Sequence, residues 1–350
     1  MPSIDRGALK VAWTVFLFAL AVYILYLIRQ TIVVFALAVF LAQLLGSLVE
    51  GLERLSVHGI TRKRALALVY LMLAAVVIAV VVPLVASAGE QAAALATHLP
   101  AALQNDPLGH IPLPVWLEDI RPRLTDALRG QLANLDQTVG PTLKEVGSGV
   151  LSGLGNLLAA VLIPILSFFF VKDGPLIRRA ILSSVKADKR LMLMEILKDL
   201  NQLLARYIRS LVLLAILVFV VYSLFFGAAG VPYALFLATV AALFEFIPVA
   251  GPLVASLAIL VVSGLTGYPH MLMLFIFLIV FRLLQDYVVN PYLMSAGVAI
   301  HPLVVLFGVL AGEQIAGIPG MFFSVPVMAA LRIIVLRIRK DAKDAKEARA

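Results

Sequence analysis

The chain contains no cysteine, so disulfide bonds, thiolate metal ligands and cysteine nucleophiles are excluded. It also lacks a G-x-x-x-x-G-K-[ST] loop, and ATP-driven work by this chain alone is therefore not expected. An H-E-x-x-H metal helix is missing, as is any catalytic dyad of the kind that an intramembrane protease needs. The sequence thus predicts neither an enzyme nor a bound cofactor or metal ion.

Charge is also scarce in this chain. Charged residues make up 14% of it and hydrophobic residues 62%, and the mean hydropathy is +1.05. Soluble domains are about 25% charged and about 45–50% apolar. Several apolar runs reach the roughly 18–20 residues that cross a bilayer, so a tightly packed soluble helical protein does not account for the sequence. We therefore predict an all-α, polytopic integral membrane protein.

About eight membrane segments follow one another along the chain. The unbroken segments are Val11–Ile28, Thr31–Val49, Ala65–Ala86, Gly153–Val171, Leu211–Ala229 and Met271–Val289, and those that Pro and Gly interrupt are Tyr233–Leu265 and Pro302–Val335. The first segment is not expected to be a cleaved signal peptide, because its apolar run is too long and a second follows almost at once. The third is expected to end near Pro83.

Basic residues between the segments predict the orientation. The stretch 172–209 holds nine Lys/Arg against four Asp/Glu, and the tail from Arg332 holds seven against three. The stretch 87–147 holds four basic and seven acidic residues. Since Lys and Arg accumulate in cytoplasmic loops, we expect both termini inside and 87–147 outside. The net charge of +8 fits this topology and anionic lipid headgroups better than nucleic acid, because the basic residues lie beside the spans among acids.

Two polar stretches have the pattern of amphipathic helices. In the outer stretch, Pro100 and three later prolines are expected to break the chain into short helices, of which Val115–Leu135 is the clearest. These helices either pack against the membrane core or cover its outer entrance. The inner stretch, Ile177–Arg209, is expected to lie along the membrane surface with its apolar face down.

Only four charged residues occur between Leu211 and Leu331, and they are Glu245, Arg282, Asp286 and Glu313. Two of them lie in broken stretches, F-E-F-I-P-V-A-G-P and G-E-Q-I-A-G-I-P-G. An ionised group in hydrocarbon is costly and usually marks a pathway, and a broken helix is tolerated only inside protein or against a water-filled cavity. Charge and helix break together are typical of a transporter binding site. The sequence therefore predicts membrane transport.

The two broken segments can be interpreted in two ways. As re-entrant hairpins, one turns at Ile247–Pro252 and the other near Gly312–Gly320, and a unit of one span plus one hairpin then occurs twice in opposite orientations. Such an inverted repeat places a substrate site near the membrane midplane. Alternatively, each broken segment crosses the membrane fully. We favour the hairpins, because each arm of the first has only about fourteen residues, short of the roughly twenty that a span needs.

The residues expected to line or shape a substrate or ion pathway fall at the two breaks and at the end of Met271–Val289. They are Glu245, Pro248, Gly251, Pro252, Gln285, Asn290, Pro291, Glu313, Gln314, Gly317, Pro319 and Gly320. Each glutamate either binds a proton or cation or forms hydrogen bonds to the freed backbone, and both interpretations stay open. Arg282 and Asp286 are four apart, and a structural ion pair is favoured over a coupling-ion site because a neutralised pair is less costly in a low dielectric.

The stretches at these breaks also carry a resemblance. The blocks G-V-P-Y-A-L-F-L-A-T-V-A-A-L-F-E-F-I-P-V-A-G-P-L (Gly230–Leu253), Q-D-Y-V-V-N-P-Y-L-M-S-A-G-V-A-I-H-P-L-V-V-L (Gln285–Leu306) and G-I-P-G-M-F-F-S-V-P (Gly317–Pro326) resemble the autoinducer-2 exporter family of permease-like proteins. The similarity extends along the whole chain. Where family members often have a polar uncharged residue before I-P, this chain has Phe246 preceded by Glu245, which would favour a cation or proton.

What this resemblance implies is a permease that works without ATP hydrolysis. Family members have been linked to export of autoinducer-2 and others to sodium/proton exchange, and they are associated with homo-oligomers, by resemblance pentamers. The expected function is therefore alternating-access export of a small polar solute such as autoinducer-2. The alternative is a monovalent cation/proton antiporter built on Glu245, Asp286 and Glu313. A third possibility is a scaffold that transports nothing.

The expected organisation has six parts within a bacterial inner membrane. They are N-terminal scaffold spans (1–86), an extracytoplasmic helical insert (87–147), a fourth span (148–171), cytoplasmic amphipathic helices (172–210), a transport core (211–336) and a basic cytoplasmic tail (337–350). The expected partners are the lipid bilayer, the transported solute or cation, and further copies of the chain.

Overall fold

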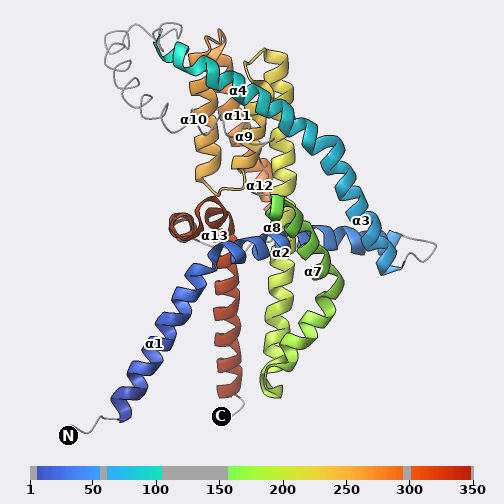
Figure 1. Ribbon diagram of the computed structural model, residues 1–350, viewed down its shortest axis with the longest axis vertical. Helices are drawn as coiled ribbons and strands as arrows, with labels where there is room; N and C mark the ends of the chain where they lie inside the picture. The colour runs from blue at the N-terminus through green and yellow to red at the C-terminus, as the bar shows by residue number, and fades with distance from the viewer. Residues whose placement is uncertain (1–5, 56–60, 105–156, 295–300, 348–350) are drawn as a thin grey trace.

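The computed structural model describes residues 6–55, 61–104, 157–294 and 301–347, and every regular element in these ranges is helical (Figure 1). Before the long gap the elements are α1 (Arg6–Leu27), α2 (Arg29–Leu55), α3 (Arg62–Val76), the π-helical turn η1 (Val77–Val81) and α4 (Val82–Gln104). After it come α7 (Leu157–Ser183), η3 (Ala187–Lys189), α8 (Arg190–Ala229), α9 (Ala234–Phe244), α10 (Ala250–Leu265), α11 (Met271–Leu284), the π-helical turn η4 (Gln285–Val289), α12 (Asn290–Met294) and α13 (Pro302–Glu347). The predicted helix Val115–Leu135 and the start of the predicted span Gly153–Val171 lie outside the described residues.

Apolar helices dominate the structure. Within the described residues, six stretches are long and apolar enough to cross a membrane: Lys10–Leu27, Arg29–Arg54, Arg62–His98, Arg190–Ala229, Met271–Leu293 and Leu303–Lys340. Helices α9 and α10 are apolar but shorter. Large side chains on these helices face outward, for example Phe18, Leu257 and Leu272, which are 72%, 63% and 72% exposed. Apolar surface of this extent has to be covered by lipid or by other protein, so the chain is a polytopic membrane protein.

Two prolines do not end helices where the sequence predicts a break. Helix α4 contains Pro83 and Pro100 and runs on to Gln104. Pro has no N–H, and its ring clashes with the carbonyl four residues earlier in a regular α-helix. The π-helical turn η1 ends two residues before Pro83 and widens the helix there, so that Pro83 fits without a break. The boundary predicted between residues 86 and 87 therefore falls inside a helix.

Helix α8 is a single element of 40 residues, which corresponds to a length of roughly 60 Å. Its polar half, up to Arg209, continues in the same direction as the apolar half that follows (Figure 1). The prediction that residues 177–209 lie along the membrane surface is therefore wrong from Arg190 onward, because an unbroken helix cannot both lie in the surface and continue into a crossing. The helix ends at Gly230, whose positive φ of 68° suits glycine.

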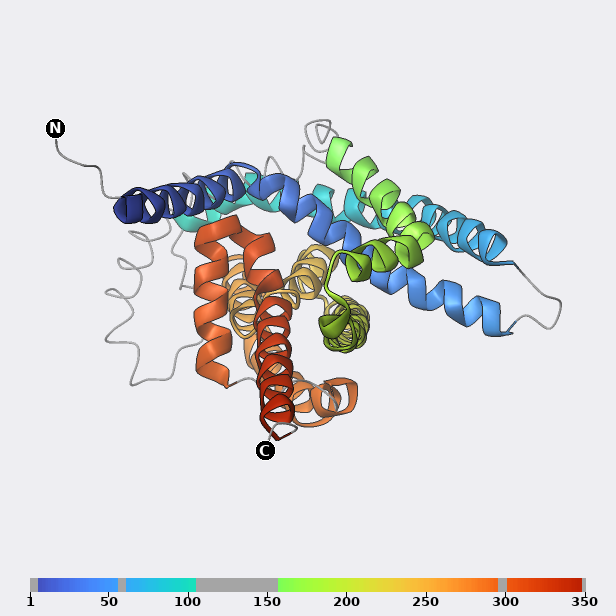
Figure 2. The same cartoon turned by 90° about the horizontal axis from the view of Figure 1, so that it is seen from below.

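Both broken segments fold back as helical hairpins. Helices α9 and α10 are joined by a tight turn over 245–249. Helix α13 is interrupted at Ala316 and Gly317, and the arms on either side return past each other, as the orange-to-red helices in Figure 2 show. Helix α2 lies across α8 rather than alongside it (Figures 1 and 2). The apolar stretches therefore do not all share one direction.

Two buried clusters hold these helices together. The larger joins α4, α8, α9, α10 and α11 and is centred on fully buried Phe226, Leu237, Ile259 and Leu274. The smaller joins α2, α3 and α7 around Leu45, Val49 and Ala65. Beside it a hydroxyl pair 2.7 Å apart, Tyr70 with Ser167, links α3 to α7. The first cluster fixes the turn between α9 and α10 against α11, where the candidate site lies.

Candidate functional site

The first break begins where α9 ends at Phe244. The backbone N–H groups of Phe246 and Ile247 donate to the carbonyls of Leu243 and Phe244, at 3.2 and 2.9 Å. The N–H of Ala250 then donates across Val249 to the carbonyl of Pro248, at 2.7 Å, which closes a three-residue γ-turn. Its central residue, Val249, has φ 64° and ψ −57°. This form of the γ-turn is rare and strained, and the β-branched side chain adds to the strain.

Gly251 and Pro252 allow α10 to begin directly after the turn, close to the end of α9. A Cβ at Gly251 would lie 1.8 Å from the carbonyl oxygen of Phe244, so only glycine fits there. Pro252 lies in the first turn of α10, where an N–H has no helical partner to lose. The Pro and Gly residues that predict a break at 247–252 therefore form it.

The acidic residue at this break is buried. Glu245 is 8% exposed, and its Oε2 accepts a hydrogen bond from Nε2 of Gln285, at 2.8 Å. Gln285 is 2% exposed, so water has almost no access to either partner. A hydrogen bond to a charged group contributes about 1.5–3 kcal/mol, and leaving such a group buried without a partner costs more. The pair therefore locks the end of α9 to the end of α11.

Gln285 begins the π-helical turn η4, which separates α11 from α12. A π-helical turn inserts one extra residue into a helix and changes the direction of the side chains around it. This turn ends two residues before Pro291, just as η1 ends two residues before Pro83. Sequence reasoning missed both turns, and a proline inside an otherwise continuous apolar run is the signal that could have indicated them.

A second polar group lies on the same helix surface. Nε of Arg282 is 2.9 Å from Oδ2 of Asp286, so the two residues pair, and Nδ2 of Asn290 donates to Oδ1 of Asp286 at 3.3 Å. Both charged side chains are partly exposed, at 31% and 39%. Gln285, the hydrogen-bond partner of Glu245, directly precedes Asp286 in the chain. The structure thus brings Glu245, Gln285, Arg282, Asp286 and Asn290 into one electrostatic unit.

The second break uses glycine in the same way. Gly317 has φ 61° and ψ −140°, a conformation open essentially only to glycine. A Cβ at Gly312 would lie 2.3 Å from the carbonyl oxygen of Gly320, and one at Gly320 would lie 1.9 Å from that of Gly312. The two arms of α13 therefore touch through their backbones. Pro319 lies next to this contact.

The polar residues of the second break do not join the buried unit. Glu313 and Gln314 are exposed, and within the described residues no hydrogen bond or ion pair connects them to Glu245 or Gln285. Of the predicted pathway residues with polar side chains, the structure therefore brings together Glu245, Gln285 and Asn290 and leaves Glu313 and Gln314 apart from them. Within the described residues, no group of three or more His, Asp or Glu side chains is placed to hold a metal ion.

Aromatic contacts connect the two hairpins. Phe246, at the first turn, packs against Phe322 in the second arm of α13, with ring centroids 5.6 Å apart. Phe322 in turn packs against Phe40 of α2, at 4.8 Å. Aromatic pairs in this edge-to-face geometry contribute about 0.5–1.5 kcal/mol beyond their buried area. Phe246 therefore serves as a contact between hairpins.

Comparison with known proteins identifies the family of this chain. Residues 15–340 match the family described as AI-2E family transporter. The chain belongs to the AI-2E transporter family. The resemblance inferred from the blocks at Gly230, Gln285 and Gly317 is thereby confirmed, and the family is described as one of transporters.

Relatives of this AI-2E protein occur in bacteria and archaea. It is 27% identical over 203 residues to YrrI of Bacillus subtilis (strain 168), covering 57% of this chain and 58% of YrrI. It is 27% identical over 199 residues to MJ1177 of Methanocaldococcus jannaschii (56% and 60%), and 25% identical over 218 residues to PerM of Escherichia coli K12 (61% of each chain). The aligned region thus spans about three fifths of each relative. Their names provisionally describe YrrI and MJ1177 as transport proteins and PerM as a permease.

Proposed function

We propose that this AI-2E protein is a secondary transporter of the bacterial inner membrane that exports a small polar solute, such as autoinducer-2, by alternating access. The observation that carries the proposal is the buried hydrogen bond between Glu245 and Gln285. It joins a broken hairpin to the helix beside it, within apolar helices that have almost no other charge. Buried polar groups at helix breaks are the usual location of substrate and ion sites in transporters.

The proposed mechanism uses the two hairpins as moving parts. The unit of α8 followed by the α9–α10 hairpin and the unit of α11 followed by the α13 hairpin form an inverted repeat. In this scheme both termini lie in the cytoplasm, and the hairpins enter the membrane from opposite sides. The glycine-lined turns at Gly251 and Gly317 support the scheme, because they give each hairpin a compact tip. The Phe246–Phe322 contact joins the turn of the first hairpin to the second arm of α13, so in this scheme a movement of one hairpin would be passed to the other.

Assembly into a homo-oligomer belongs to the same proposal. Within the part of the chain that the structure describes, helix α1 has no buried residue in its apolar stretch and contacts little besides α2. Its exposed aromatic and aliphatic side chains would pack against lipid or against another copy of the chain. A pentamer, the state implied by the family resemblance, would surround the transport cores with these first helices.

A monovalent cation/proton antiporter is the second candidate. It is favoured by the neutral character of the partner of Glu245, an amide, while Arg282 is already paired with Asp286. A buried carboxylate without a directly bonded cation is suited to take up a proton or a small cation. Of the three acids first considered for this role, Glu313 is exposed and separate, so the antiporter would depend on Glu245 and Asp286.

Reconstitution separates the two candidates. The purified chain is placed in liposomes that contain a pH-sensitive dye, and labelled autoinducer-2 is supplied on one side. If autoinducer-2 crosses the membrane and Glu245→Gln reduces this movement, the result supports the exporter. Proton flux driven by a sodium or potassium gradient, and abolished by the same substitution, supports the antiporter. Silence in both assays, with the chain correctly folded, would contradict autoinducer-2 export and cation/proton antiport and would leave either another solute or a scaffold that transports nothing.

A further inference from the structure

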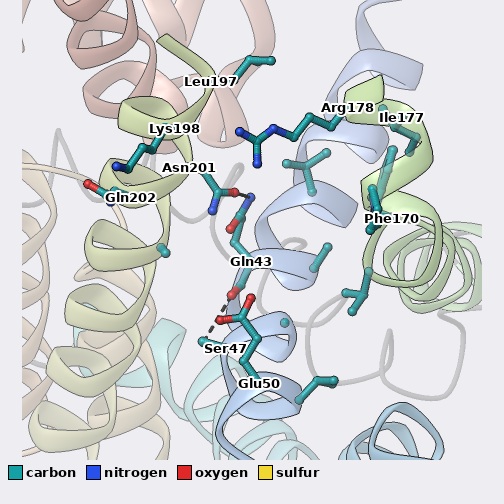
Figure 3. A pocket seen from close by; sticks show the side chains of 18 of the residues that line it. Gln43, Ser47, Glu50, Phe170, Ile177, Arg178, Leu197, Lys198, Asn201 and Gln202 are labelled. Atoms are coloured by element: carbon teal, nitrogen blue, oxygen red, sulfur yellow. Dashed lines mark hydrogen bonds between the residues drawn. The ribbon is translucent and has the colours of Figure 1, made fainter. Parts of the chain in front are cut away.

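A large cavity lies away from the Glu245 unit, between α2, α7 and α8 (Figure 3). Its volume is about 910 Å³, which is within the size range of sites that hold a ligand. None of the residues of the Glu245 unit lines it. The amide of Gln43 on α2 donates to Oδ1 of Asn201 on α8, at 2.7 Å, and this hydrogen bond crosses the cavity.

The charge in this cavity is strongly one-sided. Among the described residues that line it, five are basic, namely Arg62, Arg178, Arg179, Lys198 and Arg209, and one, Glu50, is acidic. Within the described residues, Arg178, Arg179, Lys198 and Arg209 have no ion-pair partner. Oε2 of Glu50 is 3.9 Å from Nη2 of Arg54, so this acid also pairs with a basic residue that does not line the cavity. In Figure 3, Arg178 extends from α7 across the cavity above the Gln43–Asn201 pair. The described lining therefore carries an excess of positive charge.

The position of the basic residues along the chain indicates the depth of the cavity. Arg62 precedes the apolar run that starts at Ala65, and Arg209 precedes the one that starts at Leu211. Arg178 and Arg179 follow the apolar run that ends at Val171. Three changes from apolar to polar sequence thus meet around one cavity. This is the depth at which lipid headgroups lie beside membrane helices.

The remaining walls of the cavity are apolar. They include Val39 and Val49 of α2, Phe170 and Ile181 of α7, and Leu197 of α8. A free inorganic anion would be attracted by the basic groups but would gain nothing from these walls. A phospholipid offers both parts, an anionic phosphodiester for the basic groups and acyl chains for the apolar walls.

We propose that this cavity binds an anionic phospholipid, with its phosphodiester headgroup between Arg178 of α7 and Lys198 of α8. The bound lipid would bridge α8 to α2 and α7, which the smaller buried cluster already holds together. The proposal does not depend on which solute the protein transports.

Native mass spectrometry of the full chain in neutral detergent tests this directly. Phosphatidylglycerol and phosphatidylcholine with the same acyl chains are titrated in turn, and inorganic phosphate is then added as a competitor. The test variant is Arg178→Gln with Lys198→Gln. The control is Lys63→Gln with Arg64→Gln, which removes the same charge from exposed positions that do not line the cavity. A charge-keeping variant, Arg178→Lys with Lys198→Arg, shows whether loss of binding comes from charge or from misfolding.

Wild-type protein and the control are expected to prefer phosphatidylglycerol over phosphatidylcholine, and the test variant should lose roughly tenfold or more in phosphatidylglycerol affinity. The charge-keeping variant should retain most of it. Equal losses in test variant and control would mean general surface attraction and would overturn the proposal. So would full displacement of the lipid by inorganic phosphate, or an altered oligomeric state without altered lipid binding, which would make the cavity a contact between copies.

Discussion

At the scale of the residue, the proposed transport pathway depends on Glu245 and Gln285. Both are buried; Glu245 lies at the first helix break and Gln285 begins the π-helical turn η4, so their hydrogen bond is the point where the first hairpin and that turn meet. A neutral amide satisfies a carboxylate without cancelling its charge. The carboxylate therefore stays available for a proton, a cation or a polar solute while the fold remains intact.

Replacing Gln285 by Leu should lower the free energy of unfolding by about 1–3 kcal/mol, because the Glu245 carboxyl would stay buried without its donor. Unfolding by SDS titration of the purified protein measures this. Glu245→Gln is the matched control, since its amide oxygen can still accept from Gln285, and its stability should stay close to that of the wild type. Unchanged stability in Gln285→Leu would show that the pair contributes nothing to the fold.

Val249 offers a second test at this scale, because its positive φ is strained for a β-branched residue. Val249→Gly should leave stability unchanged or raise it, since relief of about 1–3 kcal/mol of strain offsets the added freedom of the unfolded chain. Val254→Gly in α10 is the control, with a side chain 49% exposed against 54% at Val249. It should lower the melting temperature. Equal losses in the two variants would argue against a strained γ-turn.

At the scale of the element, glycine decides how closely helices approach each other. The arms of α13 touch at Gly312 and Gly320, where neither has room for a Cβ. Gly320→Ala should therefore push the arms apart and lower both stability and transport, with a loss of about 1–3 kcal/mol from overpacking. Gly227→Ala in α8 is the control, because nothing lies within 4 Å of its Cβ position. It should raise stability, by up to about 1 kcal/mol.

Thermal unfolding together with transport in liposomes reads out both glycine variants. A Gly320→Ala protein as stable and active as the wild type would contradict the close contact between the arms. Reduced transport in Gly227→Ala would show that the effect is not specific to the hairpin.

The sequence predicts the turns and helix ends that are determined by residues within the same short stretch. The turns at 247–252 and 312–320 follow from Pro and Gly, whose backbone limits act within a few residues. The π-helical turns before Pro83 and Pro291 were not predictable in this way, because a proline in a packed helix can be accommodated as well as act as a break. The length of α8 was missed for a related reason, since a polar helix and an apolar helix can share one axis without any break signal between Arg209 and Leu211.

At the scale of the whole molecule, the polar ends of α8 and α13 are joined. Arg337 donates from Nη1 to Glu195 at 2.5 Å, and from Nε to Asp199 at 2.8 Å. Both acids are on α8, one turn apart, so a single guanidinium holds the two helices in register. This contact ties the second arm of α13 to α8. The sequence could not predict this contact, because Arg337 is 138 residues from Asp199 and 142 residues from Glu195 along the chain.

The absence of native cysteine makes this contact easy to test. Spin labels on single cysteines introduced at Leu191 of α8 and Ile338 of α13, both exposed, report the distance between the helices. We expect one narrow distance distribution in the otherwise wild-type protein. Arg337→Gln should broaden it, whereas Arg339→Gln, two residues further along the same helix, should not. An unchanged distribution in Arg337→Gln would mean that other contacts hold the helices.

The same scale shows which site predictions depend on tertiary structure. The Glu245 and Gln285 positions were identified as pathway residues, but their direct contact follows only from the packing of α9 against α8 and α11. Glu313 and Gln314 were selected by the same reasoning and are exposed. A charged residue beside a helix break predicts a position in or near a transport pathway. It does not predict which side of the helix meets the core.

The central claim is that solute or ion movement through this protein passes by Glu245. Liposomes containing the wild type or Glu245→Gln, a pH-sensitive dye and labelled autoinducer-2 allow solute efflux and proton flux to be measured in the same vesicles. In the wild type we expect either autoinducer-2 efflux or cation-driven proton flux. Glu245→Gln should reduce it roughly tenfold or more, because the amide keeps the hydrogen bond to Gln285 but no longer offers the solute or ion a charged acceptor, a loss of about 1.4 kcal/mol or more. Wild-type flux in a correctly folded Glu245→Gln protein would contradict the central claim.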